Sequence, residues 1–161
     1  MEFQKRFSTY FDRDVAQEAA KALSNGVGIE FRIRASGDAA SQPEEVFHFT
    51  KEAGRNKVTS GPAQSPEMIF TLPPAAAEQI LADPSVDIAG IGINIAKLLA
   101  STDANRRISL RLKVGFFGLF TQGYLGVLKE GGTAFAAFLT SKGLSGIDAI
   151  KSMIKKMKGS A

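Results

Sequence analysis

Residues 108–120, with the sequence ISLRLKVGFFGLF, are the stretch that most restricts how this chain can fold. Apolar and polar side chains alternate from Ile108 to Val114, which is typical of a strand with one buried face. Gly115 ends the alternation, and an aromatic run without charge continues to Leu128. A half-buried strand that leads into an apolar helix can form one wall and the lid of a cavity. It can equally form ordinary core, and the pattern leaves both interpretations open.

The same alternation assigns the two faces of this strand. We expect helices to cover its apolar face, and we expect Arg111 and Lys113 on the other face to reach solvent. The apolar residues are Ile108, Leu110, Leu112 and Val114.

Four more strands and several helices are expected along the chain. Apolar residues recur every four positions from Phe3 to Leu23, which predicts an amphipathic helix that can break near residues 12–14 and stops at Asn25-Gly26. Short alternating segments separated by polar turns favour an antiparallel meander of strands. These strands are expected at residues 28–35, 45–51, around 58 and 67–72, with helices at 75–81, 86–100, 116–129 and from 133.

Composition limits the class of protein. With 161 residues, 44% of them hydrophobic and 22% charged, the chain fits one soluble domain over residues 1–161. The sequence contains no cysteine, which excludes disulfides, thiolate metal ligands and a cysteine nucleophile. The longest uncharged run, residues 114–128, is shorter than a membrane span requires. Because residues 1–23 are amphipathic rather than signal-like, we expect a cytoplasmic protein.

The excess positive charge is concentrated at the end of the chain. The net charge of +4 arises from five lysines against Asp148 after residue 141, while the preceding residues balance. The body therefore has no basic field for nucleic acid, and we expect no nucleic-acid partner. The lysines are Lys142, Lys151, Lys155, Lys156 and Lys158.

This basic tail predicts an amphipathic helix over residues 144–158. Its apolar residues are expected to pack against the body near the mouth of a cavity, with lysines on the outer face. That outer face fits either transient contact with an anionic membrane or ordinary solvated surface. The candidate membrane-contact residues are Lys151, Lys155 and Lys158, opposite Ile147, Ile150, Ile154 and Met157.

Signals for catalysis are weak. His48 is the single histidine and has no visible partner residue, so a structural or surface role is favoured. Gly90-Ile91-Gly92 lacks the preceding strand and the third glycine of a dinucleotide fingerprint. Glu44 and Glu45 are expected to be solvated charges in a loop. We therefore expect no enzyme activity, no catalytic residue, no metal site and no cofactor beyond a bound lipid.

The apolar residues late in the chain are the candidate binding site. Their spacing fits plain core, and it also fits the wall of a cavity for a hydrophobic ligand. The candidate lipid-binding residues are Ile91, Ile95, Leu98, Phe116, Phe120, Phe135 and Phe138.

Two short motifs carry a resemblance to a known family. The EMIFTL segment at residues 67–72, followed by a helix, and the LKVG segment at 112–115 resemble the sterol-carrier-protein-type lipid-binding domain. The resemblance implies an α+β fold in which helices cover a five-stranded, mainly antiparallel sheet. It also implies a hydrophobic tunnel for fatty acyl chains, sterols or other lipids, without catalytic residues. Pro73-Pro74, Phe116-Phe117 and the apolar insert at 83–107 depart from the family pattern.

These observations predict a lipid-binding or lipid-transfer protein whose partner is a lipid or another hydrophobic ligand. The alternative is a non-catalytic scaffold that presents a lipid intermediate to partner enzymes. Both roles use the same apolar cavity, so the sequence does not separate them.

Overall fold

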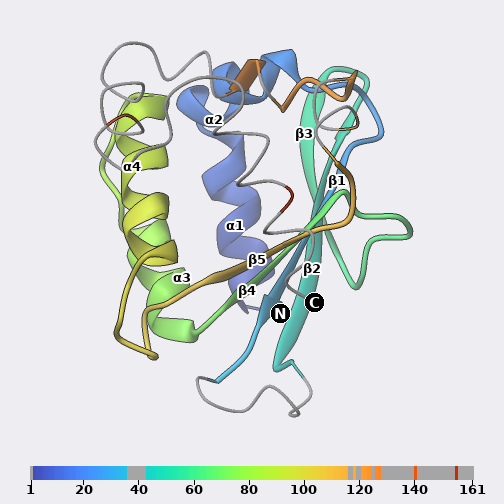
Figure 1. Ribbon diagram of the computed structural model, residues 1–161. Helices are drawn as coiled ribbons and strands as arrows, with labels where there is room; N and C mark the ends of the chain where they lie inside the picture. The colour runs from blue at the N-terminus through green and yellow to red at the C-terminus, as the bar shows by residue number, and fades with distance from the viewer. Residues whose placement is uncertain are drawn as a thin grey trace.

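The computed structural model describes residues 2–35, 43–115, 118, 121–124, 126–127, 140 and 155, except for the side chain of Ile88. Within them, five strands form one mixed sheet in the order β3-β2-β1-β4-β5 (Figure 1). The strands are β1 Gly28–Ile33, β2 Glu45–Glu52, β3 Arg55–Ser60, β4 Met68–Leu72 and β5 Ser109–Leu112.

The sheet is mainly antiparallel, as predicted, but it is not a simple meander. β1, β2 and β3 form antiparallel neighbours, whereas β4 lies on the other side of β1 and runs parallel to it. β5 then pairs antiparallel with β4. The expectation of a meander through β4 is wrong because the chain after β3 crosses the sheet instead of turning back beside β3. Glu67 donates its backbone N–H to Gly28 at the start of β1, which fixes this crossing.

The described helices lie on one face of this sheet. α1 lies over β2 and β3, and α3 and α4 stand beside it towards β4 and β5 (Figure 1). The elements are α1 Glu2–Asp12, α2 Asp14–Ala19, η1 Ala20–Ala22, α3 Pro74–Leu81 and α4 Ile88–Leu99. The N-terminal helix breaks at Arg13, whose ψ of 148° is extended, inside the interval that the sequence indicated. The expected helices after residue 115 lie largely outside the described residues.

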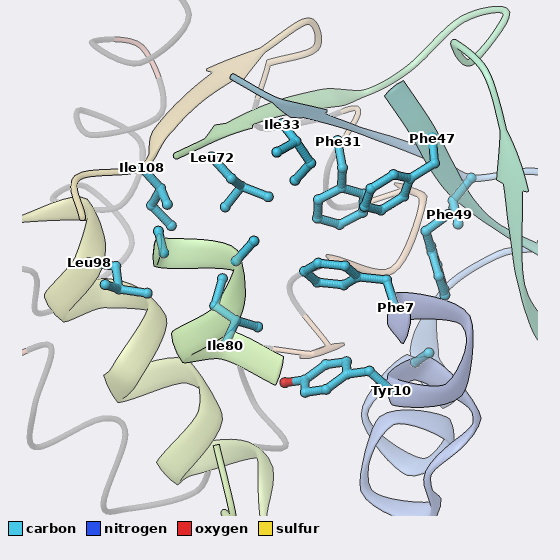
Figure 2. Packing of buried hydrophobic residues seen from close by; sticks show 14 of the residues in the cluster. Phe7, Tyr10, Phe31, Ile33, Phe47, Phe49, Leu72, Ile80, Leu98 and Ile108 are labelled. Carbon is cyan, nitrogen blue, oxygen red and sulfur yellow. The ribbon is translucent and has the colours of Figure 1, made fainter. Parts of the chain in front are cut away.

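A cluster of aromatic rings holds α1 against the sheet. Phe7 of α1 lies 5.6 Å from the ring of Phe31 in β1 and 5.2 Å from that of Phe47 in β2, measured between ring centroids (Figure 2). All three side chains are buried. Rings at these separations contribute beyond the area they bury, so this cluster fixes where α1 crosses the sheet.

The predicted register of the last strand is confirmed. Ile108 and Leu112 are buried, and Leu110 and Val114 are partly buried, whereas Arg111 and Lys113 are exposed. Lys113 also donates its backbone N–H to the carbonyl of Glu67, which extends the contact between this segment and β4.

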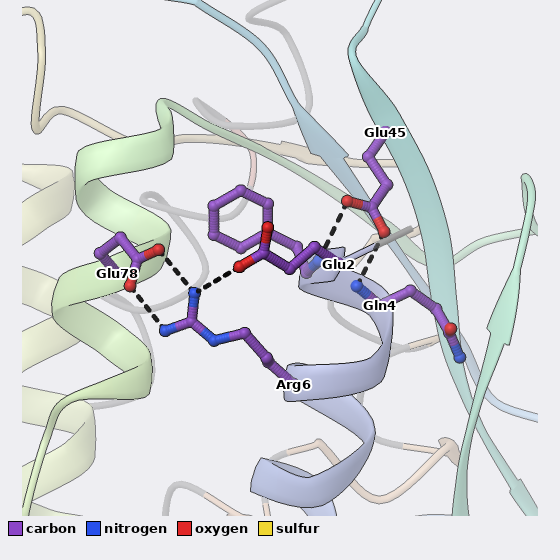
Figure 3. Close-up of polar contacts among 6 residues, drawn as sticks. Glu2, Gln4, Arg6, Glu45 and Glu78 are labelled. Atoms are coloured by element: carbon purple, nitrogen blue, oxygen red, sulfur yellow. Dashed lines mark hydrogen bonds and ion pairs between the residues drawn. The ribbon is translucent and has the colours of Figure 1, made fainter.

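Glu45 is not the solvated charge that the sequence suggested. It begins β2, is only 9% exposed, and accepts hydrogen bonds from the backbone N–H groups of Phe3 and Gln4 at 3.1 and 2.8 Å (Figure 3). The carboxylate therefore caps the first turn of α1 from a neighbouring strand, where helix N–H groups have no partner of their own. Burial opposes ionisation, but these hydrogen bonds and the N-terminal charge outweigh it and lower the pKa of Glu45.

Two further contacts secure the same helix. Arg6 forms a bidentate ion pair with Glu78 of α3, with both N–O distances 2.6 Å, and lies 3.7 Å from Glu2 (Figure 3). The pair is substantially exposed, so it contributes little to the free energy of unfolding. Its main effect is to set the direction of α1 relative to α3.

A buried ammonium group closes the other end of the helical segment. Lys51 is 7% exposed, and its Nζ donates to the carbonyls of Ala20, Lys21 and Leu23 at 2.9–3.1 Å. These carbonyls lie at the end of η1, where helical carbonyls run short of backbone donors, although that of Ala20 also accepts from the Leu23 N–H. These hydrogen bonds pair the ammonium group of Lys51 with backbone carbonyls at the end of η1. Both kinds of group need such partners when they are buried.

Replacing Lys51 tests this cap. Lys51→Met keeps the aliphatic stem but removes the ammonium donor from three carbonyls, of which that of Ala20 retains the Leu23 N–H, so the free energy of unfolding should fall by about 2–4 kcal/mol. Chemical denaturation measures the change. Lys57→Met in β3, which removes only an exposed pair with Glu52, is the matched control and should cost less than about 1 kcal/mol. Equal, small losses in both variants would contradict a structural role for the buried ammonium.

Glu45 should make stability depend on pH in the acid range. Its folded pKa is lowered, so its contribution is complete above the unfolded value of about 4.3 and is lost as pH falls through the folded value. Glu45→Gln should therefore cost about 1 kcal/mol at pH 7 and much less near pH 3. Denaturation at a series of pH values measures this difference. The exposed neighbour variant Glu44→Gln should show almost none, and a Glu45 effect that is constant with pH would refute the cap.

Candidate functional site

A pocket of about 270 Å³ opens between α3 and α4. Residues 79–84, at the end of α3 and in the loop that follows, form one wall, and α4 forms the other. The lining residues are Gln79, Ile80, Ala82, Asp83, Pro84, Asn94, Ile95 and Leu98.

Part of the pocket lining is apolar. Ile80 projects from α3, and Ile95 and Leu98 project from α4; Leu98 is 3% exposed and Ile95 is half-buried. The end of α4 is tied to the sheet, because Ile108 donates its backbone N–H to Leu98 and both side chains are buried (Figure 2). The apolar wall is therefore continuous with the hydrophobic core.

Asp83 forms the polar corner of the pocket. Its Oδ1 accepts from the N–H of Ser85, and its Oδ2 accepts from Nδ2 of Asn94, both at 2.9 Å. Burial disfavours the charged carboxylate, but these hydrogen bonds and the charge of Arg13 outweigh that effect and lower the pKa of Asp83. The carboxylate is therefore ionised at neutral pH, and it links the loop after α3 to α4.

Arg13 and Tyr10 lie behind this corner. The Arg13 guanidinium stacks on the Tyr10 ring, 4.3 Å from its centroid, and Nη1 donates to the Asp83 carbonyl at 3.3 Å. The Tyr10 side chain is 7% exposed. Burial raises the pKa of the Tyr10 hydroxyl. The charge of Arg13 and a hydrogen bond with its side chain oppose the rise, and the charge of Asp83 adds to it.

A second hollow, of about 310 Å³, lies on the opposite face of the sheet. Its lining is charged: the buried Glu30 accepts from Arg32 Nε at 2.6 Å and from the Ala63 N–H at 3.0 Å. Because these charges satisfy one another, the hollow is less suited to an apolar ligand than the pocket between α3 and α4. The rest of its lining is Arg34, Pro43, Val46 and Pro62.

The part of the chain that the structure describes shows no group of three or more potential metal ligands. His48 donates from Nδ1 to the Gly61 carbonyl at 2.9 Å, which agrees with the structural role expected for it. The described helices also include none that is long and apolar enough to cross a membrane.

The structure brings together two of the residues predicted to line a cavity, Ile95 and Leu98. Ile91 is buried but is not among the lining residues. Among the predicted membrane contacts, Lys155 is helical and exposed. The other predicted residues lie outside the described part of the chain, and their roles stay predictions: Phe116, Phe120, Phe135, Phe138, Lys151 and Lys158.

Sequence reasoning missed the polar half of the site. In the sequence, Asp83 stands before a proline and indicates only where a helix ends. Tyr10 is recognised only as a residue beside the apolar face of the N-terminal helix. One signal was available: apart from Lys97 in its last turn, Asn94 is the one polar side chain in α4. An amide at such a position needs a partner when it is packed against another element.

Comparisons with known proteins leave the family open. No protein-family model matches the chain, and no curated protein sequence matches it. One similar solved structure is that of a conserved hypothetical protein from Thermus thermophilus, TT1886, described as "possibly sterol carrier protein". It is 14% identical, the match covers 81% of this chain and 84% of that one, and the TM-score is 0.38. The assignment of the fold therefore rests on the strand order and pairing of this chain.

Truncations distinguish a pocket from a filled core. Leu72→Ala removes a fully buried side chain that does not line the pocket, and it should lower the free energy of unfolding by about 2–5 kcal/mol. Ile95 borders open space, so Ile95→Ala should cost distinctly less, about 1 kcal/mol, although the two side chains are similar in size. Chemical denaturation of both variants measures this. Equal losses would show that the space beside Ile95 is filled by protein.

Proposed function

We propose that this protein binds a hydrophobic ligand, most simply a lipid chain, in the pocket between α3 and α4. The observation that carries the proposal is an unfilled space bordered by Ile80, Ile95 and Leu98 and continuous with the core. Apolar walls with a few polar groups at one end are the usual composition of a small-molecule site.

The energy for binding would come from removing apolar surface from water, about 25 cal/mol per Å². The volume of about 270 Å³ lies just below the usual range for ligand pockets, roughly 300–1,000 Å³. This size suits one alkyl chain better than a bulky ring system. No covalent step is required, and Asp83 and Asn94 are already bonded to each other. Binding rather than catalysis is therefore the role that this geometry supports.

The proposal extends to the biological role anticipated from the sequence. An intracellular carrier would take the ligand from one membrane and release it at another, with the basic tail making transient contact with anionic lipid. Lys155 is exposed, as such a contact requires. The scaffold role, in which a bound lipid is presented to partner enzymes, uses the same pocket and remains the alternative.

Mass spectrometry of lipids extracted from purified protein tests the proposal. The wild-type protein should carry a hydrophobic compound or take up the neutral dye Nile red with increased fluorescence. Ile95→Glu places a carboxylate in the pocket and should lower uptake at least about tenfold, since an unpaired charge is costly to bury.

Ile93→Glu is the matched control for this experiment, because Ile93 lies on the same helix but does not line the pocket. This variant should retain uptake. Circular dichroism confirms that both variants are folded. Wild-type protein that neither carries lipid nor takes up the dye would refute the proposal, and so would equal loss in the two variants.

A further inference from the structure

The charges of the residues before 142 cancel in total but not in space. Residues 97–113 contain five basic residues and one acidic residue, whereas residues 1–87 contain thirteen acidic and nine basic residues. All five basic side chains are exposed. We call this set the basic corner, and its members are Lys97, Arg106, Arg107, Arg111 and Lys113.

The end of α4, the turn after it and β5 bring these side chains to one part of the surface. The turn that joins α4 to β5 lies at an edge of the molecule (Figure 1). Ile108 donates its backbone N–H to the carbonyl of Leu98 at 3.3 Å, so Lys97 and Arg107, which precede these two residues, lie on adjacent backbones.

β5 continues the basic corner along the last strand of the sheet. The leucines of β5 pack against the core on the side of the helices. Because side chains alternate along a strand, Arg111 and Lys113 project from the other face, which the described helices do not cover. The basic corner therefore extends from the end of α4 around the edge of the sheet.

Acidic side chains neutralise little of this charge. Arg106 Nε lies 3.8 Å from Asp103 Oδ2, and both side chains are more than half exposed. Among the described residues, the other four members of the basic corner form no ion pair. Glu67, whose carbonyl accepts from the Lys113 N–H, directs its Oε2 to the N–H of Gly28 at 2.6 Å. The basic corner therefore keeps most of its positive charge.

The opposite edge of the sheet carries a different pattern. Charged side chains on an edge strand discourage pairing with another chain, and charges of either sign serve this purpose. On β3, at the other edge, Lys57 pairs with Glu52 of β2 at 2.8 Å. The basic corner has an excess of one sign, which protection of an edge does not require. Such an excess attracts a partner of negative charge.

The composition of the basic corner favours one kind of negative partner. Residues 97–113 include no aromatic residue, so they lack the stacking surface that single-stranded nucleic acid uses. A protein partner usually needs a large apolar or aromatic anchor. The one large, exposed apolar side chain among the described residues, Val86, precedes α4, at the other end of this helix. An anionic bilayer needs neither feature, because its surface charge attracts clustered lysine and arginine residues.

We propose that the basic corner docks on the surface of an anionic phospholipid bilayer. The same end of α4 lines the pocket through Ile95 and Leu98, so docking holds the pocket close to the bilayer. This inference rests on the proposed function and deepens it, because it assigns the surface through which a lipid carrier meets its membrane. The surface belongs to residues 97–113 and is separate from the basic tail.

Co-sedimentation of the full chain with vesicles tests the docking. One set of vesicles contains phosphatidylcholine and phosphatidylserine, and the other contains phosphatidylcholine alone. The wild-type protein should bind the anionic vesicles and not the neutral ones, and added salt should weaken this binding. The double variant Arg107→Gln, Arg111→Gln should bind at least about tenfold more weakly, since each basic residue near such a surface contributes about fivefold.

The double variant Arg55→Gln, Lys57→Gln is the matched control. It removes the same charge from two exposed residues of β3, at the other edge of the sheet. This control should keep nearly all of the binding, and thermal melting checks that both double variants are folded. Equal loss in the two variants would show that only net charge matters and would overturn the inference. Full binding by the Arg107, Arg111 variant would overturn it too.

Uptake of Nile red separates the docking from the proposed function. The Arg107, Arg111 variant should take up the dye as the wild-type protein does, because neither residue lines the pocket. Wild-type protein that takes up the dye but does not bind anionic vesicles would overturn the docking alone, and so would binding to polyuridylate RNA without binding to the vesicles. If the wild-type protein binds the vesicles but takes up no dye and carries no lipid, the proposed function fails instead.

Discussion

The ammonium group of Lys51 is the contact on which the arrangement of the N-terminal half depends. It reaches from β2 to three carbonyls at the end of η1, and the backbone carbonyl of Lys51 accepts from Gly26 at 2.8 Å. Gly26 has a φ of +85°, which lets the chain reverse from helix into β1. Lys51 thus holds the end of η1 and Glu45 caps the start of α1, while the aromatic cluster around Phe7 sets where α1 crosses the sheet. Tyr10 of α1, and Arg13 just after this helix, are thereby brought to α3.

The order and type of the described elements could be predicted because local pattern determines them. Alternation placed β5 in the correct register, and Pro73-Pro74 marked the start of α3. The parallel pairing of β4 with β1 could not be predicted, because a polar connection has the same composition whether it turns back or crosses the sheet. The cap formed by Glu45 was missed for a related reason. A glutamate at the start of a strand is ordinarily solvated, and only the tertiary position of α1 makes it a partner.

The candidate site also has one part that local sequence pattern predicts and one part that depends on tertiary packing. Ile95 and Leu98 could be found because an apolar helix with repeated isoleucine and leucine predicts a buried wall. The polar corner depends on side chains from three separate segments: Arg13, Asp83 and Asn94. No spacing in the sequence relates them, since only the packing of α1 against α3 brings Arg13 to Asp83. The pattern therefore indicated an apolar wall, whereas the structure adds a polar corner whose groups are bonded to one another.

Photolabelling with an alkyl chain that carries a diazirine tests the central claim most directly, because it reports where a hydrophobic ligand lies. If the pocket between α3 and α4 holds the chain, mass spectrometry should find the label on residues 79–84 and 94–98. An excess of unlabelled methyl dodecanoate should suppress this labelling. Labelling confined to other parts of the chain, or labelling at these residues that competitor does not reduce, would contradict the account.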